Sequence, residues 1–119
     1  MSFNKQMKTD QKSQSLASAA LAHVLTVEEE NAELLSVMVH FTSAVTQTAT
    51  ITLARKVAGV LTNYVWVLDT QSLSGAVNYI FRPTGVVGLK RGDTLTVAVT
   101  NSGTPAITAY SEILYRENV

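Results

Sequence analysis

The sequence of 119 residues contains no cysteine and few charged residues. Without cysteine the chain can form neither a disulfide framework nor a thiolate metal site, which excludes the disulfide-rich secreted domains and the thiolate zinc proteins. Only 15% of the residues are charged and the formal net charge is zero, so the basic surface that nucleic-acid binding requires is missing. We therefore expect no nucleic-acid partner.

Long apolar runs are missing as well. The longest apolar stretches fall short of the roughly 20 residues that span a bilayer. The amino end has lysines but no apolar segment directly after them, which is not the pattern of a secretory signal peptide. We expect no membrane partner and no signal peptide.

Threonine and serine are abundant instead, and many of them alternate with valine, leucine and isoleucine. β-Branched side chains fit a pleated, half-buried surface better than a helix, and the chain is long enough for one domain. Short alternating segments separated by turn residues predict an all-β fold, an antiparallel β-sandwich of seven or eight strands. A jelly-roll-like arrangement is our first expectation and an immunoglobulin-like sandwich our second.

Residues 1–18 are rich in Lys, Gln, Ser and Thr, with Phe3, Met7 and Leu16 as their apolar anchors. This composition cannot bury enough surface to offset the entropy that is lost on ordering. We predict a flexible N-terminal arm over 1–18 and a β-sandwich domain over 19–119. The arm is either a frayed terminus or a segment that orders on a neighbouring subunit, and in the second case Phe3 and Met7 are candidate interface residues.

The clearest strand pattern lies in residues 33–43, whose predicted core face holds Leu35, Val37, Val39 and Phe41. Residues 48–56 repeat the alternation after a short connection, so the two segments are predicted to form a hairpin. Residues 19–28 are predicted to form an earlier strand, with a short helix over 15–22 as the competing interpretation. Further strands are predicted at 76–82, 85–92, 94–100 and 106–117.

Residues 63–70 form a strand pattern that is apolar on both faces, because Tyr64 and Trp66 alternate with Val65 and Val67. Such a strand is expected in the centre of a sheet, or one of its faces meets a partner chain. In the second case Tyr64 and Trp66 are candidate interface residues.

Residues 91–93 read Arg-Gly-Asp, a tripeptide best known as a cell-attachment signal. An exposed loop would present the guanidinium and the carboxylate to a receptor. The same residues suit a tight turn, because glycine supplies a positive φ and aspartate hydrogen-bonds nearby backbone before a strand starts at Thr94. We interpret Gly92 and Asp93 as a structural turn.

Candidate metal ligands and acid–base groups are few, namely His23, His40, Glu28, Glu29, Glu30 and Glu33. No HExxH motif or comparable ligand spacing occurs among them. A Ser-His-Asp site could be assembled from His40, Asp69 or Asp93 and a serine, since such triads are recognised by geometry, but the sequence has no GxSxG elbow. We expect no enzyme activity, no catalytic or metal residues and no cofactor.

Six aromatic residues could build a platform on which a sugar ring stacks, namely Tyr64, Trp66, Tyr79, Phe81, Tyr110 and Tyr115. Packing in the core and burial in an interface are the alternative, because aromatic side chains dominate both. Tyr110 is an exposed aromatic candidate for sugar binding and a further candidate interface residue.

Residues 78–117 read NYIFRPTGVVGLKRGDTLTVAVTNSGTPAITAYSEILYRE. They combine a strand, a turn with proline and glycine, the pattern L-K-x-G-D-x-L-x-V, an Asn-Ser-Gly turn and a long last strand. In this architecture the stretch from Glu33 to Glu117 resembles the small β-sandwich decoration or cement proteins, and related head or tail accessory proteins, of tailed bacteriophages.

The resemblance implies a non-enzymatic component of the virion that forms a symmetric homo-oligomer, with a trimer favoured, and binds a major capsid or tail protein. It carries no catalytic or metal residues with it. A carbohydrate- or receptor-binding β-sandwich module is the alternative function.

Overall fold

The computed structural model describes residues 6–56, 63–101 and 107–117. In this part of the chain nine β-strands form two antiparallel sheets, and no helix is long and apolar enough to cross a membrane. The strands are β1 (Gln6–Ser15), β2 (Leu21–Thr26), β3 (Asn31–Val45), β4 (Thr48–Lys56), β5 (Asn63–Ser72), β6 (Ala76–Phe81), β7 (Val87–Lys90), β8 (Thr94–Val99) and β9 (Thr108–Glu117).

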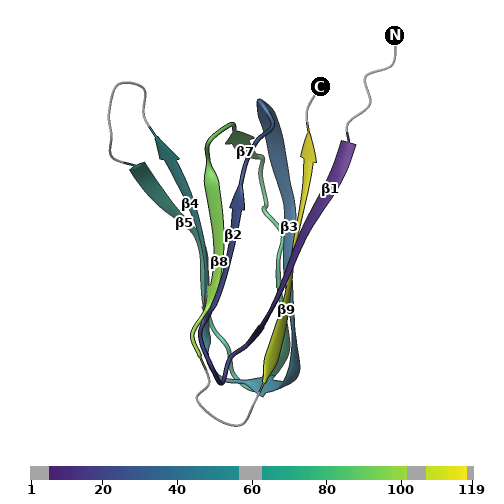
Figure 1. Cartoon of the computed structure of the whole chain (residues 1–119), viewed down its shortest axis with the longest axis vertical. Helices are drawn as coiled ribbons and strands as arrows, with labels where there is room; N and C mark the ends of the chain where they lie inside the picture. The colour runs from purple at the N-terminus through teal and green to yellow at the C-terminus, as the bar shows by residue number, and fades with distance from the viewer. Residues whose placement is uncertain (1–5, 57–62, 102–106, 118–119) are drawn as a thin grey trace.

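Sheet A has the strand order β1-β9-β3-β6, and β7 pairs with the first residues of β3. Sheet B has the order β2-β8-β4-β5. The two sheets face each other, and β4 and β5 flare outwards at one end of the molecule (Figure 1). The first four strands alternate between the sheets, which gives a jelly-roll-like connectivity. The predicted antiparallel β-sandwich is confirmed, with nine strands in the described residues rather than the predicted seven or eight.

The core lies between the sheets because alternate residues of most strands are apolar and face the opposite sheet. In sheet B, Leu25, Leu95 and Leu53 form one row across β2, β8 and β4, and all three are buried. Tyr79 of β6 and Phe41 of β3 are the largest fully buried side chains that sheet A contributes. Each fully buried side chain of this size stabilises the fold by about 1.5–3 kcal/mol.

A bulge in β3 changes which of its residues face the core. Between Leu34 and Ser36 the register with β9 shifts by one residue, so Leu35 is an extra residue in β3. Leu34 is therefore buried, whereas Leu35, which strict alternation places on the core face, is only partly buried. The predicted core residues that follow the bulge are buried, namely Val37, Val39 and Phe41.

Residues 6–15 form β1, an edge strand of sheet A, and the prediction of a flexible arm is wrong for these residues. β1 pairs with β9 along its whole length, from Gln6 opposite Glu117 to Ser15 opposite Thr108. In the described part of the chain, the sandwich therefore already includes Gln6–Ser15 and does not start at residue 19. Phe3 lies outside the described residues.

The strand predicted over residues 19–28 is confirmed as β2, and the competing helix over 15–22 does not form. A further prediction about local structure is wrong. The hairpin predicted between residues 33–43 and 48–56 does not form, because β3 belongs to sheet A and β4 to sheet B. The two residues between these strands carry the chain from one sheet to the other instead of reversing it within a sheet.

β5 is the edge strand of sheet B, so the expectation that it lies in the centre of a sheet is wrong. It pairs with β4, from Thr48 opposite Ser72 to Lys56 opposite Asn63, and with no other strand in the part of the chain that is described. Leu68 is an extra residue in this pairing, at a bulge. Both faces of residues 64–67 remain exposed.

Candidate functional site

The Arg-Gly-Asp tripeptide lies in the turn between β7 and β8. Gly92 has a φ of 90°, a left-handed conformation that favours glycine. Its N–H donates to the carbonyl of Val27 at 2.9 Å, and the N–H of Asp93 donates to the carbonyl of Lys90 at 3.0 Å. The turn is thereby closed on itself and attached to the end of β2.

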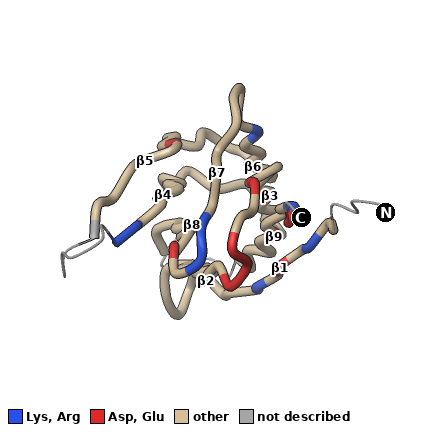
Figure 2. Tube along the Cα trace, turned by 90° about the horizontal axis from the view of Figure 1, so that it is seen from above, with Lys and Arg blue, Asp and Glu red and all other residues tan. Residues whose placement is uncertain are grey.

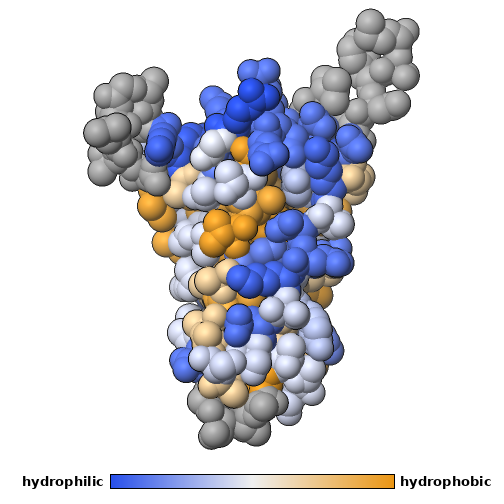
Figure 3. Space-filling model, in the orientation of Figure 1, coloured by the Kyte–Doolittle hydropathy of each residue, from blue (hydrophilic) through white to orange (hydrophobic). Residues whose placement is uncertain are grey.

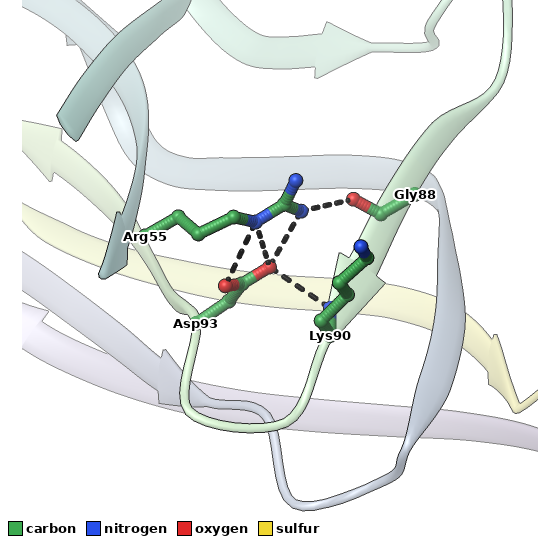
Figure 4. A network of polar contacts seen from close by, with 4 residues as sticks. All are labelled: Arg55, Gly88, Lys90 and Asp93. Atoms are coloured by element: carbon green, nitrogen blue, oxygen red, sulfur yellow. Dashed lines mark hydrogen bonds and ion pairs between the residues drawn. The ribbon is translucent and has the colours of Figure 1, made fainter. Parts of the chain in front are cut away.

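The carboxylate of Asp93 is buried in this turn (Figure 4). It accepts hydrogen bonds from Nε of Arg55 at 3.0 Å, from Nη2 of Arg55 at 2.7 Å and from the N–H of Lys90 at 2.9 Å. The hydrogen bond to Asp93 raises the pKa of Arg55. Since Asp93 is only 2% exposed, its carboxylate is not presented to a receptor, and the tripeptide acts as a turn in this fold.

A Ser-His-Asp arrangement does occur, but its histidine and its serine are buried. Nε2 of His23 on β2 lies 2.7 Å from Oδ2 of Asp10 on β1, and Nδ1 lies 2.7 Å from Oγ of Ser111 on β9. A carboxylate only accepts hydrogen bonds, so in the neutral ring Nε2 donates to Asp10 and Nδ1 accepts from the Ser111 hydroxyl. Only 2% of Ser111 is exposed. The arrangement links the two sheets and does not present a nucleophile.

The triad considered from the sequence does not assemble. His40 lies on the outer face of sheet A, with its Nδ1 2.8 Å from Oδ1 of Asn78. Asp69 accepts a hydrogen bond from the hydroxyl of Tyr79, and Asp93 is bound to Arg55. Across residues 6–56, 63–101 and 107–117, no cluster of three His, Asp or Glu side chains could hold a metal ion.

The edge of the sandwich formed by β1 and β2 is closed by charged side chains that point between the sheets. Nζ of Lys8 lies 3.2 Å from Oε1 of Glu29, and Nζ of Lys12 donates to the carbonyl of Ala22 at 3.1 Å. Burial acts to raise the pKa of Glu29, but the hydrogen bonds from Lys8, from its own backbone N–H and from Tyr115, together with the charge of Lys8, outweigh burial, and the pKa is lowered. A band of hydrophilic residues follows β1 in Figure 3. We call this region the closed edge.

The opposite edge of the sandwich is apolar and uncovered at residues 64–67 of β5, which we call the open edge. The exposed fractions of Tyr64, Val65, Trp66 and Val67 are 58%, 61%, 45% and 62%. Trp66, paired with the buried Leu53, lies on the core-facing side of sheet B, and Val67, paired with Thr52, lies on the outer side. The strand therefore exposes apolar side chains on both faces, in addition to its unpaired backbone.

The two aromatic residues of the open edge lie near each other, and Arg55 of β4 lies over one of them. The guanidinium carbon of Arg55 lies 5.6 Å from the ring centroid of Trp66, within the range of a cation–π contact. The rings of Tyr64 and Trp66 are 6.3 Å apart. Further along the same edge, a shallow hollow of about 270 Å³ lies between Leu68 and residues 81–87. The aromatic faces that do not meet Arg55 remain available for contact.

A groove of about 600 Å³ lies on the outer face of sheet A. Two rows of residues cross it, each with one residue from β1, β9, β3 and β6 in that order. The first row is Gln11, Glu112, Met38 and Ile80, and the second is Ser13, Tyr110, His40 and Asn78. Tyr110 is about half exposed. The two rows thus combine one aromatic and two apolar side chains with neutral hydrogen-bonding groups and the carboxylate of Glu112.

The predicted interface residues are distributed over three surfaces. Tyr64 and Trp66 belong to the open edge, Tyr110 lies in the groove of sheet A, and Met7 is exposed on β1. The six aromatic residues do not form a common platform, since Tyr79 and Tyr115 are buried. The sequence did not point to Asp10 and Ser111, which bind His23, or to Met38 and Ile80, which line the groove. Strand pairing brings these residues to their neighbours, and no local pattern reveals it.

No family model matches this sequence, and no curated protein matches it. Among solved structures, that of the cysteine protease and lectin-like domains of Cwp84, a surface-layer-associated protein of Clostridium difficile, is 14% identical with a TM-score of 0.51. The match covers 92% of this chain and 36% of that one. A chain of infectious bursal disease virus, Gx strain, is 8% identical with a TM-score of 0.51, over 97% of this chain and 33% of the viral one.

A protein of the Bacillus endospore appendages, described as disulfide-linked pili, is 16% identical over 98% of this chain and 91% of that one, with a TM-score of 0.39. This chain spans about a third of the length of the first two structures. At such low identities, what this chain shares with those two is a fold.

Proposed function

We propose that this chain is a non-enzymatic structural subunit of a virion, a decoration or cement protein that binds and stabilises the capsid or the head–tail lattice of a tailed bacteriophage. The observation that carries the proposal is the open edge, where four consecutive residues are 45–62% exposed on an edge strand that pairs only with β4 in the described part of the chain. Natural proteins normally protect such edges, and apolar surface of this kind marks contact with another chain. A subunit of a lattice buries it on assembly.

The rest of the molecule suits this role. The outer face of sheet B is lined by small and β-branched residues, including the row Val24, Thr96, Thr52 and Val67, and the formal net charge is zero. A neutral surface does not repel neighbouring copies. The similarity of residues 33–117 to phage accessory proteins suggests the kind of particle, and the chain of infectious bursal disease virus shows this fold in another virus.

The test is made on particles. Mass spectrometry of particles purified from the phage that encodes this chain should detect it, and particles from a deletion strain should release their DNA at a lower temperature. Purified Trp66→Lys protein should rebind such particles several-fold more weakly than wild type, whereas Val24→Lys, at the opposite edge of sheet B, should rebind normally. Expression of the chain during infection without its presence in particles would contradict the proposal.

A second candidate function is binding of a neutral sugar in the groove of sheet A. Its volume of about 600 Å³ lies within the range of small-ligand sites, roughly 300–1,000 Å³. An aromatic face takes the apolar face of a pyranose, and Gln11, His40 and Asn78 offer amide and imidazole groups to its hydroxyls. This function would add to attachment, since the groove and the open edge are separate surfaces.

A glycan array tests this second function. Binding should be lost on Tyr110→Ala and retained on Tyr64→Ala, which removes a comparably exposed tyrosine outside the groove. An array without signal for the wild-type protein would dismiss sugar binding and leave the structural proposal untouched.

A further inference from the structure

We propose that β5 pairs antiparallel with β5 of a second copy of this chain, about a two-fold axis perpendicular to the strands, so that the B sheets of the two copies become one continuous sheet. The inference rests on the proposed function in one respect, namely that the open edge is the surface used for assembly. It goes further by naming the occupant of that edge and the symmetry of the contact.

The protection of the other edge strands singles out β5. β1 carries Lys8, Asp10 and Lys12 on its side toward sheet B, where all three have polar partners. β2 has six residues, and its carbonyl at Ala22 accepts from Lys12. The other edge of sheet A is divided between β6 and β7, with Pro83 between them. Charges, short strands and proline are the usual means of preventing strand addition.

β5 has none of these protections where it is exposed. It is ten residues long, and Asp69 is its single charged residue. The carboxylate of Asp69 already accepts the hydrogen bond from Tyr79, so it adds little repulsion between two copies. Seen from above, the charged residues lie mainly along β1 and at the turns near β2, β3 and β7, whereas β5 is almost free of them (Figure 2). A strand of this kind accepts a neighbour.

The side chains of the open edge are complementary to themselves. Val65 and Val67 lie on one face of β5, and Tyr64 and Trp66 on the other. In an antiparallel pair of two β5 strands, the valines of one copy meet the valines of the other, and the aromatic rings meet likewise. Cross-strand pairs of β-branched or aromatic residues stabilise a sheet, and like charges are what would oppose the pairing. No like charges meet in residues 64–67.

Two-fold symmetry follows from this self-complementarity. A contact in which a patch meets itself is isologous and closes with two copies, whereas a three-fold assembly needs two different patches that meet head to tail. The open edge is a patch that can meet its own copy in an isologous contact. The expected assembly through β5 is therefore a dimer, in place of the trimer that the family resemblance favours.

The absence of native cysteine makes the geometry directly testable. In an antiparallel pair that is symmetric about a two-fold axis, the residue nearest the axis faces its own copy, within the Cβ separation that a disulfide spans. Single cysteines are placed in turn at positions 64, 65, 66 and 67 and oxidised. The yield of disulfide-linked dimer should be highest at one position or at two positions on the same face of β5. Cysteine at position 24 should stay monomeric.

Position 24 is a matched control, because Val24 is 52% exposed and lies in the same row of sheet B as Val67, at the opposite edge. Sedimentation equilibrium of the cysteine-free protein should show a monomer–dimer equilibrium. Val65→Lys or Val67→Lys should each raise its dissociation constant about tenfold or more, since each change acts twice in the dimer. Val24→Lys should leave the dissociation constant unchanged.

A wild-type monomer at all concentrations, a trimer, or equal crosslinking at positions 24 and 67 would overturn the inference. Urea unfolding of each variant verifies that the domain still folds. The outcomes also separate the inference from the proposed function. If the protein is monomeric but present in particles, the β5 pairing is wrong and the proposed structural role stands. If it forms the β5 dimer but is absent from particles, the pairing stands and the structural role is wrong.

Discussion

At the closed edge of the sandwich, charged and polar side chains of β1 point between the sheets and find partners there. At the open edge, apolar side chains of β5 point to both sides and find few. Asp10, His23 and Ser111 form a continuous hydrogen-bonded link across the closed edge. On the side of the open edge, the sheets are linked by single hydrogen bonds, from the hydroxyl of Tyr79 to Asp69 and from Nη2 of Arg55 to the carbonyl of Gly88. The two edges of the sandwich therefore differ in chemistry, since one is polar and internally hydrogen-bonded and the other is apolar and exposed.

The difference between the two edges shows how one sandwich can be stable as a single chain and still expose a surface for association. Buried polar groups that are satisfied within the chain gain nothing from a new neighbour, because they would have to give up bonds that they already make. Exposed apolar groups gain free energy when a neighbour covers them. The closed edge therefore contributes to the stability of the single chain, and the open edge to assembly.

The largest effect is expected at the closed edge, for His23→Ala. The change removes a buried ring, leaves a cavity and leaves the Ser111 hydroxyl without its partner. We expect a loss of about 3 kcal/mol in the free energy of unfolding, measured by urea denaturation. The neighbouring Val24→Ala, at an exposed position of the same strand, should cost about 0.5 kcal/mol or less. Similar small losses for both variants would show that the link across the closed edge contributes little.

The next effect is a loss of stability at alkaline pH, to which a tyrosine at each edge contributes. Burial raises the pKa of both Tyr79, at the open edge, and Tyr115, at the closed edge, and the neighbouring carboxylates of Asp69 and Glu29 raise it further. The folded protein then holds these protons more tightly than the unfolded chain does. The resulting stabilisation is complete below the unfolded pKa of about 10 and is lost as the pH rises above it.

Urea unfolding between pH 8 and pH 11 measures this loss. Above pH 10 each tyrosine contributes a slope of at most about 1.4 kcal/mol per pH unit. Tyr79→Phe and Tyr115→Phe should each make the decline shallower. The double variant should leave only the part that comes from other groups with a raised pKa, such as Lys8, whose hydrogen bond to Glu29 raises its pKa. A slope that is unchanged in Tyr79→Phe would mean that this hydroxyl does not lose its proton on unfolding in that range.

The sandwich itself could be predicted from the sequence because alternation is a local property. In β8, Leu95, Val97 and Val99 alternate with polar or small residues and all three are buried. β1 could not be predicted in this way, since its polar side chains are satisfied by residues distant in sequence, such as His23 for Asp10. Composition alone gives no information about such partners.

The surfaces were predictable only in part, for a related reason. The apolar character of both faces of residues 64–67 is visible in the sequence, but their position at an edge depends on the order of strands in sheet B. The turn at Gly92 and Asp93 follows a local pattern, whereas the pairing of Asp93 with Arg55 joins β4 to a turn 38 residues away. Strand order and long-range pairing therefore decide which residues are free to interact.

The smallest effect on the single chain is expected at the open edge, for Val67→Thr. Val67 is 62% exposed and Val24 is 52% exposed in the same row of sheet B, so both substitutions to threonine should change the free energy of unfolding by about 0.5 kcal/mol or less in dilute solution. The two variants should separate as the protein concentration rises. Association stabilises the folded state by mass action, and only Val67→Thr weakens the open edge. The melting temperature of Val24→Thr should rise with concentration as it does in the wild type, and that of Val67→Thr should rise less. If both variants keep the full concentration dependence, the two valines are equivalent, and exposed apolar surface on β5 has no role that β2 lacks.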